Sequence, residues 1–90
     1  MDRNTTVKLA KKLNVTDLSG EKVMVDFESG KYFLIKGVGN DIWDMLGEPI
    51  TVGEITDRLL SEYEVEENVC LESVINFLTE LLKLDFISAE

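Results

Sequence analysis

The chain has 90 residues, which is enough for one domain with a single hydrophobic core but not for a deep, walled active site as well. Its formal net charge is −9, and an acidic body repels phosphate backbones, so the composition argues against nucleic acid as a partner. We interpret the acidity first as an aid to solubility, with a basic partner as the alternative. No apolar run approaches the ~18 residues of a membrane span, and the N-terminus lacks the apolar centre of a signal peptide. The single cysteine, Cys70, cannot form an internal disulfide. From these features together we expect a cytoplasmic location and no membrane span.

The N-terminal segment is the least determined part of the chain. Residues 1–6 are expected to form a loose polar tail. Residues 7–13 could be a strand, a helical turn or an ordered arm, and the local pattern does not choose among these. We therefore group residues 1–12 as a partly flexible N-terminal arm and residues 13–90 as the folded domain.

Three short strands are predicted next, over residues 13–18, 22–27 and 31–35. The first alternates apolar and polar side chains, and the other two are rich in β-branched, aromatic and aliphatic residues. Turn residues separate them at Ser19-Gly20-Glu21 and Glu28-Ser29-Gly30. The pattern predicts an antiparallel meander, followed by a sharp corner at Gly37-Val38-Gly39.

Two helices are predicted after this corner. The first covers about residues 39–46, ends at Gly47-Glu48-Pro49, and carries Trp43 as the expected anchor of the core. The second begins at Thr51, where Glu54 three residues later completes a capping box. Ile50 and Ile55 have the spacing of a hydrophobic staple around this cap.

The third predicted helix, over residues 68–83, is the longest. Its apolar side chains span an arc close to 180°, wider than the ~100° that docks one helix face on a core. The arc is centred on Val74, Leu78 and Leu81, with Cys70, Phe77 and Leu84 on one flank and Leu71, Ile75 and Leu82 on the other. This helix is therefore either buried on two sides, which is the simpler interpretation, or lines a groove with one flank.

The sequence lacks the commonest catalytic side chain and shows no catalytic motif. The chain has no histidine, which removes the commonest general base and the commonest zinc ligand. Cys70 lies within an apolar helix flank, where a buried, inert thiol is expected. The carboxylates show no calcium-loop spacing, and Gly37-Val38-Gly39 is not followed by the third glycine of a dinucleotide loop. We predict no enzyme activity, no cofactor and no metal.

The order and spacing of the elements resemble those of a known family. The segments GEKVMVD, ESGKYFLI, the Gly-x-Gly corner, IWDML, TVGEI, YEVEENV and VINFLTELLKLDFI follow one another as in PqqD-like proteins, the leader-recognition elements for ribosomally made, post-translationally modified peptides. The resemblance covers residues 13–87 and implies an α+β, winged-helix-like fold with a three-stranded antiparallel sheet followed by three helices. Residues 13–90 would then form a leader-peptide-binding domain.

The resemblance also implies a binding mode. The leader of a precursor peptide would add as an antiparallel strand to the edge of the third strand and dock against the third helix, a case of β-augmentation. Carried over by position, the candidate contacts are Lys31, Tyr32, Phe33, Leu34 and Ile35 on the strand and Cys70, Val74, Phe77, Leu78 and Leu81 on the helix. Which of them face the core and which face the leader is left open by the sequence.

Within the family, the length of the chain and its segments GEKVMVDFESGKYF and IWDML most resemble those of the discrete leader-binding proteins of lasso-peptide biosynthesis. These proteins work with a leader peptidase and a macrocyclase. The alternative is a peptide chaperone for a radical-SAM enzyme. The family members that act in this way in quinone biosynthesis tend to carry Pro-Glu-Gly where this chain has Glu28-Ser29-Gly30, which favours the lasso-peptide type. A DNA-binding winged helix would share the element order, but the third helix offers only Lys83 as a basic residue. A small oligomerisation or adaptor domain would also explain the wide apolar arc.

Overall fold

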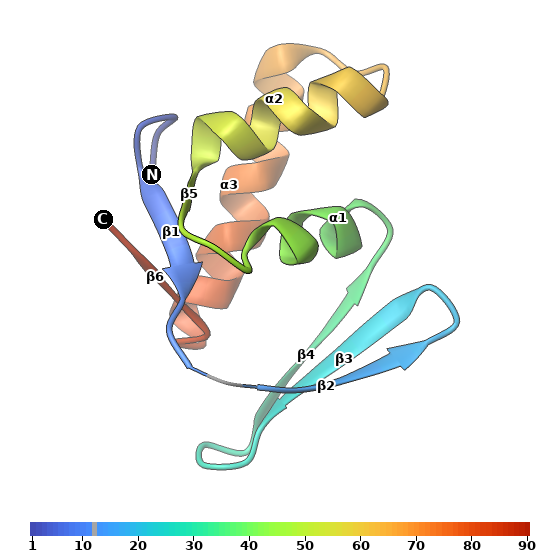
Figure 1. Cartoon of the computed structure of the whole chain (residues 1–90), viewed down its shortest axis with the longest axis vertical. Coiled ribbons are helices and arrows are strands. Elements are labelled where there is room, and N and C mark those ends of the chain that lie inside the picture. The colour runs from blue at the N-terminus through green and yellow to red at the C-terminus, as the bar shows by residue number, and fades with distance from the viewer. Residues whose placement is uncertain (12) are drawn as a thin grey trace.

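The computed structural model describes residues 1–11 and 13–90, and in these residues it has six strands and three helices (Figure 1). The elements are β1 (Thr6–Leu9), β2 (Asn14–Leu18), β3 (Glu21–Asp26), β4 (Lys31–Lys36), α1 (Val38–Met45), β5 (Ile50–Thr51), α2 (Val52–Glu62), α3 (Glu67–Lys83) and β6 (Ile87–Ala89). The strands form two separate three-stranded sheets. One is the predicted meander, and the other joins the two ends of the chain.

The meander has the strand order β2-β3-β4 and lies at one end of the molecule, with β4 leading directly into α1 (Figure 1). Its first turn is Ser19-Gly20, with φ angles of 40° and 90°, as in the two-residue turns that suit the twist of a hairpin. The second turn is closed by a hydrogen bond from the Gly30 N–H to the Asp26 carbonyl, 2.8 Å long. The predicted three-stranded antiparallel sheet, and with it the α+β fold class, is confirmed.

The second sheet, β5-β1-β6, has no counterpart in the predictions. Val7 is fully buried at its centre and pairs with Ile50 on one side and Ala89 on the other. The segment left open as strand, helical turn or arm is thus a strand over Thr6–Leu9. Its partners lie more than forty residues away along the chain, so no local pattern could identify it. Lys12, the last residue of the predicted arm, lies outside the described residues.

The expected loose tail over residues 1–6 is instead attached to α2. The Val52 N–H donates to the Thr5 carbonyl at 2.9 Å, and the Gly53 N–H donates to the Arg3 carbonyl at 3.0 Å. The Arg3 guanidinium also forms an ion pair with Asp57, with 2.6 Å between Nη2 and Oδ1. The two backbone hydrogen bonds occupy N–H groups in the first turn of α2 that have no partner within the helix.

The linker from β1 to the meander is held by Asp26. The Lys11 ammonium lies 2.9 Å from the Asp26 carboxylate, which also accepts hydrogen bonds from the Ser29 hydroxyl and the Glu28 N–H. The hydrogen bond from Lys11, followed by the one from Ser29, lowers the pKa of the Asp26 carboxyl below its usual value. One carboxylate therefore connects the linker with the β3–β4 turn.

The helices begin close to the predicted positions. The Thr51 hydroxyl accepts a hydrogen bond from the Glu54 N–H at 3.1 Å, so the cap is confirmed, and Ile50 and Ile55 are both buried in the core. In α3 the centre of the apolar arc is buried, and both flanks are partly covered. Core residues therefore cover more than one face of α3. Trp43 is only partly buried and packs at the margin of the core.

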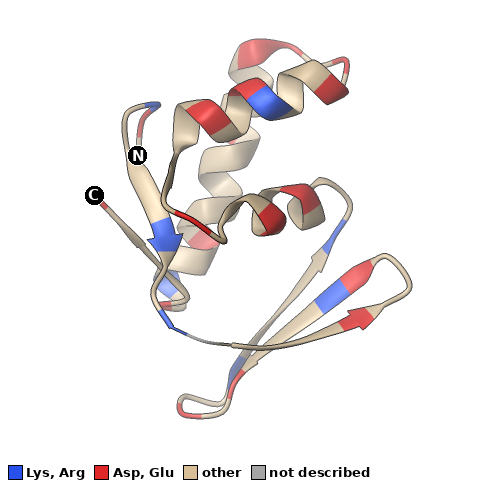
Figure 2. Cartoon of the chain, in the orientation of Figure 1, with Lys and Arg blue, Asp and Glu red and all other residues tan. Residues whose placement is uncertain are grey.

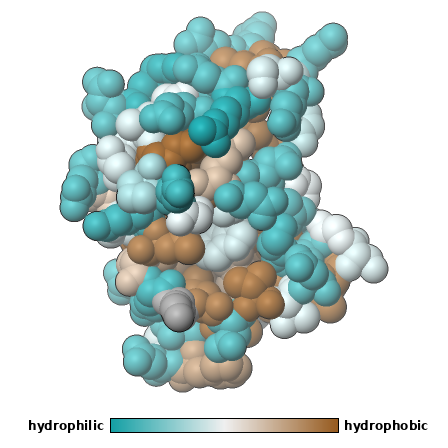
Figure 3. Space-filling model, viewed as in Figure 1, coloured by the Kyte–Doolittle hydropathy of each residue, from teal (hydrophilic) through white to brown (hydrophobic). Residues whose placement is uncertain are grey.

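Apolar side chains also reach the surface. In the space-filling view they gather around the connection from β1 to β2 and beneath α1, whereas hydrophilic side chains cover most of α2 (Figure 3). A hollow at this connection is lined by Leu9, Leu13, Val15 and Trp43, among others. Within the described residues, no helix is both long enough and apolar enough to cross a membrane.

Candidate functional site

The outer edge of β4 has no partner strand among the described residues, because the sheet order places β4 at the margin. The direction of its backbone groups follows from the β2–β3 turn. A two-residue turn makes its flanking residues, Leu18 and Glu21, a hydrogen-bonded pair. Hydrogen-bonded and non-bonded pairs alternate along antiparallel strands, so the backbone of Met24 is directed towards β4, where its partner is Phe33.

The same alternation assigns the free backbone groups of β4. Because Phe33 is directed towards β3, the N–H and C=O groups of Tyr32, Leu34 and Lys36 point away from the sheet. Unpaired groups of this kind form a template for a further strand. Lys31 and Lys36 stand at the two ends of this edge, and both are exposed.

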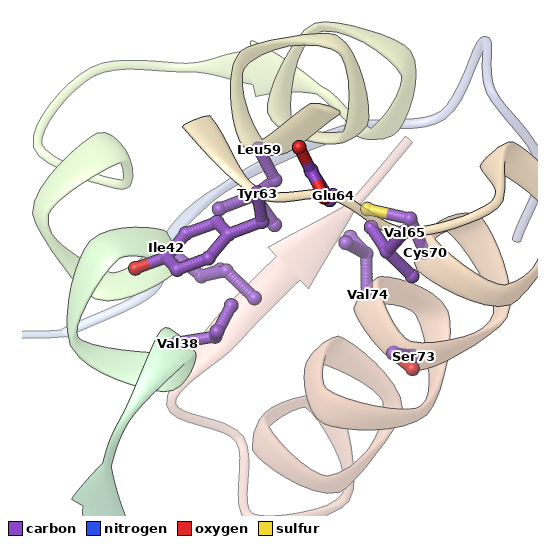
Figure 4. Close-up of a pocket in the computed structure, with 9 residues that line it drawn as sticks. All are labelled: Val38, Ile42, Leu59, Tyr63, Glu64, Val65, Cys70, Ser73 and Val74. Atoms are coloured by element: carbon purple, nitrogen blue, oxygen red, sulfur yellow. The ribbon is translucent and has the colours of Figure 1, made fainter. Parts of the chain in front are cut away.

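A hollow of about 380 Å³ lies beyond the end of β4, between α1, the α2–α3 connection and the N-terminal half of α3 (Figure 4). Val38 and Ile42 of α1 and Val74 of α3 stand on opposite sides of it (Figure 4). The complete lining is Val38, Ile42, Leu59, Tyr63, Glu64, Val65, Cys70, Ser73 and Val74. Since seven of these nine side chains are aliphatic, aromatic or thiol groups, the hollow suits an apolar side chain.

Tyr63 forms one wall of this hollow and is fixed from outside it. Its hydroxyl donates to the Asp41 carboxylate at 2.6 Å, which connects the end of α2 with α1. This hydrogen bond, and then burial, raises the pKa of the Tyr63 phenol above its usual value, so the neutral form is favoured. In Figure 4 the ring of Tyr63 lies beside Ile42, with its oxygen turned towards α1.

Along the length of β4, the strand and α3 meet through two aromatic rings. Phe33 and Phe77 pack edge to face, with 6.0 Å between centroids and an interplanar angle of 80°. Gly39 allows this approach, because a Cβ at Gly39 would lie 2.9 Å from Ile35 and 3.0 Å from Phe77. The two rings therefore occupy space between strand and helix, and the hollow opens at the end of the strand.

The ten predicted contact residues fall into three groups. The side chains of Lys31, Tyr32 and Leu34 are exposed. Phe33 and Phe77 are partly buried and touch each other. The core contains Ile35, Cys70, Val74, Leu78 and Leu81.

Of this buried group, Cys70 and Val74 line the hollow, and Ile35, Leu78 and Leu81 do not. Burial also raises the pKa of the Cys70 thiol, which disfavours the reactive thiolate. The assignment of peptide contacts stays a prediction for all ten residues.

Val38, Tyr63 and Ser73 line the hollow but were missed by the sequence reasoning. They come from three elements whose approach is a tertiary feature. The available signal was an apolar side chain at each of two exposed positions, Val38 at the start of α1 and Val65 between α2 and α3. Such residues are normally too common on surfaces to identify a site.

Charge is unevenly distributed around this region. Acidic side chains predominate on α1 and α2, and basic ones occur on β1, β3 and β4 (Figure 2). Glu64 is the acidic residue that lines the hollow, and Asp41 stands behind Tyr63. On α3, Lys83 is paired with Glu80 at 3.8 Å.

An unpaired strand edge beside an apolar hollow is the arrangement of domains that bind extended peptides. The sequence comparisons agree with this class. The profile of the family described as coenzyme PQQ synthesis protein D (PqqD) matches residues 21–87, and the chain belongs to this family. Among curated proteins, no sequence matches the chain.

A solved structure described as TbiB1 in complex with the TbiA(beta) leader peptide is similar to this chain over nearly its whole length. The TM-score is 0.78 and the sequence identity is 25%, with 90% of this chain and 94% of that chain covered. The two chains therefore share the same overall fold.

Proposed function

We propose that the chain is a non-catalytic recognition element that binds the leader segment of a ribosomally made precursor peptide. The leader adds as an antiparallel strand to the outer edge of β4 and places an apolar side chain in the hollow between α1 and α3. The observation that carries this proposal is that two features adjoin each other. The free backbone groups run along the edge of β4, and the apolar hollow lies at the end of the same strand. The similarity to a protein solved with a leader peptide supports it.

The direction of addition connects the two features. A strand antiparallel to β4 has its N-terminal end at Lys36, where β4 passes into α1 and the hollow begins. The N-terminal part of the leader therefore reaches the hollow, and the C-terminal part leaves near Lys31 and the β3–β4 turn. In this arrangement the Phe33–Phe77 pair forms the floor beneath the added strand.

The expected affinity follows from a small number of contacts. About three apolar anchors at ~1.5–3 kcal/mol each and several backbone hydrogen bonds at ~0.5–1.5 kcal/mol must exceed the costs of association and ordering. A net binding free energy of about 8–11 kcal/mol corresponds to a micromolar to ten-nanomolar complex. This range suits a protein that holds a precursor and later releases it to a leader peptidase and a macrocyclase.

Binding is tested by fluorescence anisotropy with two labelled probes. One is the TbiA(beta) leader peptide, and the other is a peptide selected against the full chain from a displayed library of random 20-residue sequences. Saturable binding of either probe, with a dissociation constant no weaker than micromolar, is expected. Absence of binding by both probes would contradict the proposal.

The position of the site is tested by filling the hollow. Ser73→Phe places a ring into the hollow from the exposed face of α3, whereas Asn76→Phe adds the same ring at an exposed position of α3 outside the lining. We expect Ser73→Phe to weaken probe binding at least tenfold, because the ring occupies the space of the leader side chain. Asn76→Phe should leave it within about twofold, and equal losses in the two variants would place the peptide elsewhere.

A further inference from the structure

The Tyr63 wall of the hollow belongs to a segment with little regular structure. Tyr63 ends α2, where its N–H donates to the Leu59 carbonyl at 2.9 Å. Residues 64–66 belong to no helix or strand, and α3 begins at Glu67. Tyr63 is 43% exposed, so packing holds only part of its surface. The position of this wall therefore depends on the contacts that the side chain itself makes.

Polar contacts hold α1 on two sides. Towards the meander, the Asn40 side-chain amide donates to the Gly20 carbonyl at 2.7 Å and accepts from the Lys22 ammonium at 3.3 Å. Towards α2, the Tyr63 hydroxyl donates to the Asp41 carboxylate at 2.6 Å. Among the described residues, this is the one side-chain hydrogen bond that joins α1 to α2 or to the α2–α3 connection. It therefore sets where the ring stands between these elements.

The hydrogen bond between Tyr63 and Asp41 is of the strong kind. Hydroxyl–carboxylate bonds of about 2.5–2.7 Å are charge-assisted and roughly twice as strong as bonds between neutral groups. The hydrogen bond raises the pKa of the Tyr63 phenol, so the phenol keeps its donor proton throughout the neutral range. The ring is thus fixed in one position before any peptide arrives.

We propose that Tyr63 determines how strongly the chain discriminates between leader side chains at the hollow, and that Asp41 is the positioning residue that holds its ring. The ring lies beside Ile42, and Ser73 and Val74 of α3 stand across the hollow from it (Figure 4). A leader side chain between them contacts the ring on one side and α3 on the other. This inference rests on the proposed function, because it takes the hollow to be the site of one apolar leader residue.

The physical basis is preorganisation. Binding has to overcome the cost of ordering every mobile group at the site, and a group that is already fixed adds no such cost. With the hydrogen bond intact, the Tyr63 ring is ready to pack against an apolar side chain. Without the bond, the ring has to be ordered first, and only a peptide that fills the hollow meets this cost. Loss of the bond therefore weakens a filled complex more than an unfilled one.

A role in discrimination can be separated from a role in stability. A variant that merely unfolds part of the population lowers the apparent affinity for every peptide by the same factor. The ratio of the dissociation constants of two peptides is then unchanged. A variant that frees the Tyr63 ring lowers that ratio, because it affects only the peptide that fills the hollow.

The test uses the labelled probe that the wild type binds more tightly, together with a version that has alanine at its anchor. The anchor is the apolar residue in the N-terminal half of the probe whose replacement by alanine weakens binding most. Anisotropy gives the two dissociation constants, and their ratio, for the wild type and for each variant. Thermal melting verifies that every variant is folded.

The variants remove the hydrogen bond from either side. They are Tyr63→Phe, which keeps the ring, Asp41→Ala, and both together. Asp41→Asn retains an acceptor oxygen at the same place and tests for rescue. The control is Asp44→Ala, which removes a carboxylate of the same helix that lies 3.6 Å from the Lys22 ammonium and outside the lining of the hollow.

We expect alanine at the anchor to weaken binding to the wild type at least tenfold. Tyr63→Phe and Asp41→Ala should each reduce this ratio at least threefold and by similar factors. The double variant should reduce it no further, because both changes remove the same hydrogen bond. Asp41→Asn should keep most of the wild-type ratio, and Asp44→Ala should keep all of it.

Unchanged ratios in Tyr63→Phe and Asp41→Ala would overturn this inference and leave the proposed function intact. A wild type that binds the probe equally well with and without its anchor would have the same consequence. Additive reductions in the double variant would show that the two side chains act separately, which contradicts the role of Asp41. A wild type that binds neither labelled probe would overturn the proposed function itself.

Discussion

Gly39 determines how closely α1, β4 and α3 approach each other. It stands in the first turn of α1, and any Cβ there would press on the Ile35 and Phe77 side chains. The contact between Phe33 and Phe77 depends on this approach. A residue without a side chain thus determines the position of the Phe33–Phe77 pair, which lies beneath the strand that we propose the leader adds.

At the residue scale, we predict that Gly39→Ala destabilises the protein. The added methyl group forces Ile35 or Phe77 to move, which costs about 1–3 kcal/mol, more than the gain of up to ~1 kcal/mol from better helix propensity. Urea unfolding followed by circular dichroism measures the change. Gly47→Ala is the matched control, since the nearest atom to its Cβ would be 3.9 Å away. Equal stability of the two variants would show that the junction is loosely packed.

The meander is an element with two open edges, one on β2 and one on β4. The β4 edge adjoins the hollow between α1 and α3, whereas β2 is exposed along its whole length. Exposed edges are a liability for unwanted pairing. The position of the hollow is the reason why we propose β4, and not β2, as the edge that receives a peptide.

At the element scale, we predict that Leu34→Pro weakens leader binding at least tenfold while the protein remains folded. Proline removes an N–H that points away from the sheet, so it costs one hydrogen bond to the leader and hinders its approach. Asp17→Pro is the matched control, because the same alternation directs the Asp17 N–H to the free side of β2. Anisotropy with the labelled leader compares the two variants, and thermal melting verifies folding. A larger loss in Asp17→Pro would move the binding edge to β2.

At the scale of the whole molecule, the N-terminal and C-terminal segments meet in one sheet. β1 lies between β5 and β6, so residues near both termini complete one sheet beside α2 and α3 (Figure 1). Val7 and Ile87 are both buried in the core. The N-terminal segment is consequently part of the folded body, although the family match begins only at residue 21.

At the scale of the whole molecule, we predict that Val7→Ala lowers the free energy of unfolding by about 1.5–3 kcal/mol, because it removes buried methyl groups at the centre of the second sheet. Lys8→Ala, at the exposed neighbouring position, should change it by less than ~0.5 kcal/mol. Chemical denaturation gives both values. Unfolding free energies of Val7→Ala and the wild type that agree within error would mean that β1 is only loosely attached.

Features encoded by neighbouring residues could be predicted. The Ser19-Gly20 turn, the Thr51 cap with Glu54, and the apolar centre of α3 each depend on side chains a few positions apart. The site was only partly predictable. The β4 edge followed from the family resemblance, but the periodicity of α3 could not separate its buried residues from those near a groove. Three of the five helix positions proposed as contacts, Phe77, Leu78 and Leu81, lie outside the lining of the hollow.

By itself, the sequence determined the class of fold, the family and the absence of histidine-based chemistry, because these follow from short-range patterns and composition. Only the tertiary structure decided that the N-terminal segment is a central strand and that Val38, Tyr63 and Ser73 surround one hollow. It also decided that the apolar side chains of Phe27, Tyr32 and Leu34 are left exposed on the meander. The physical reason is that burial depends on which distant segments meet, and an apolar side chain has the same local signature whether it is covered by its own chain or left for a partner.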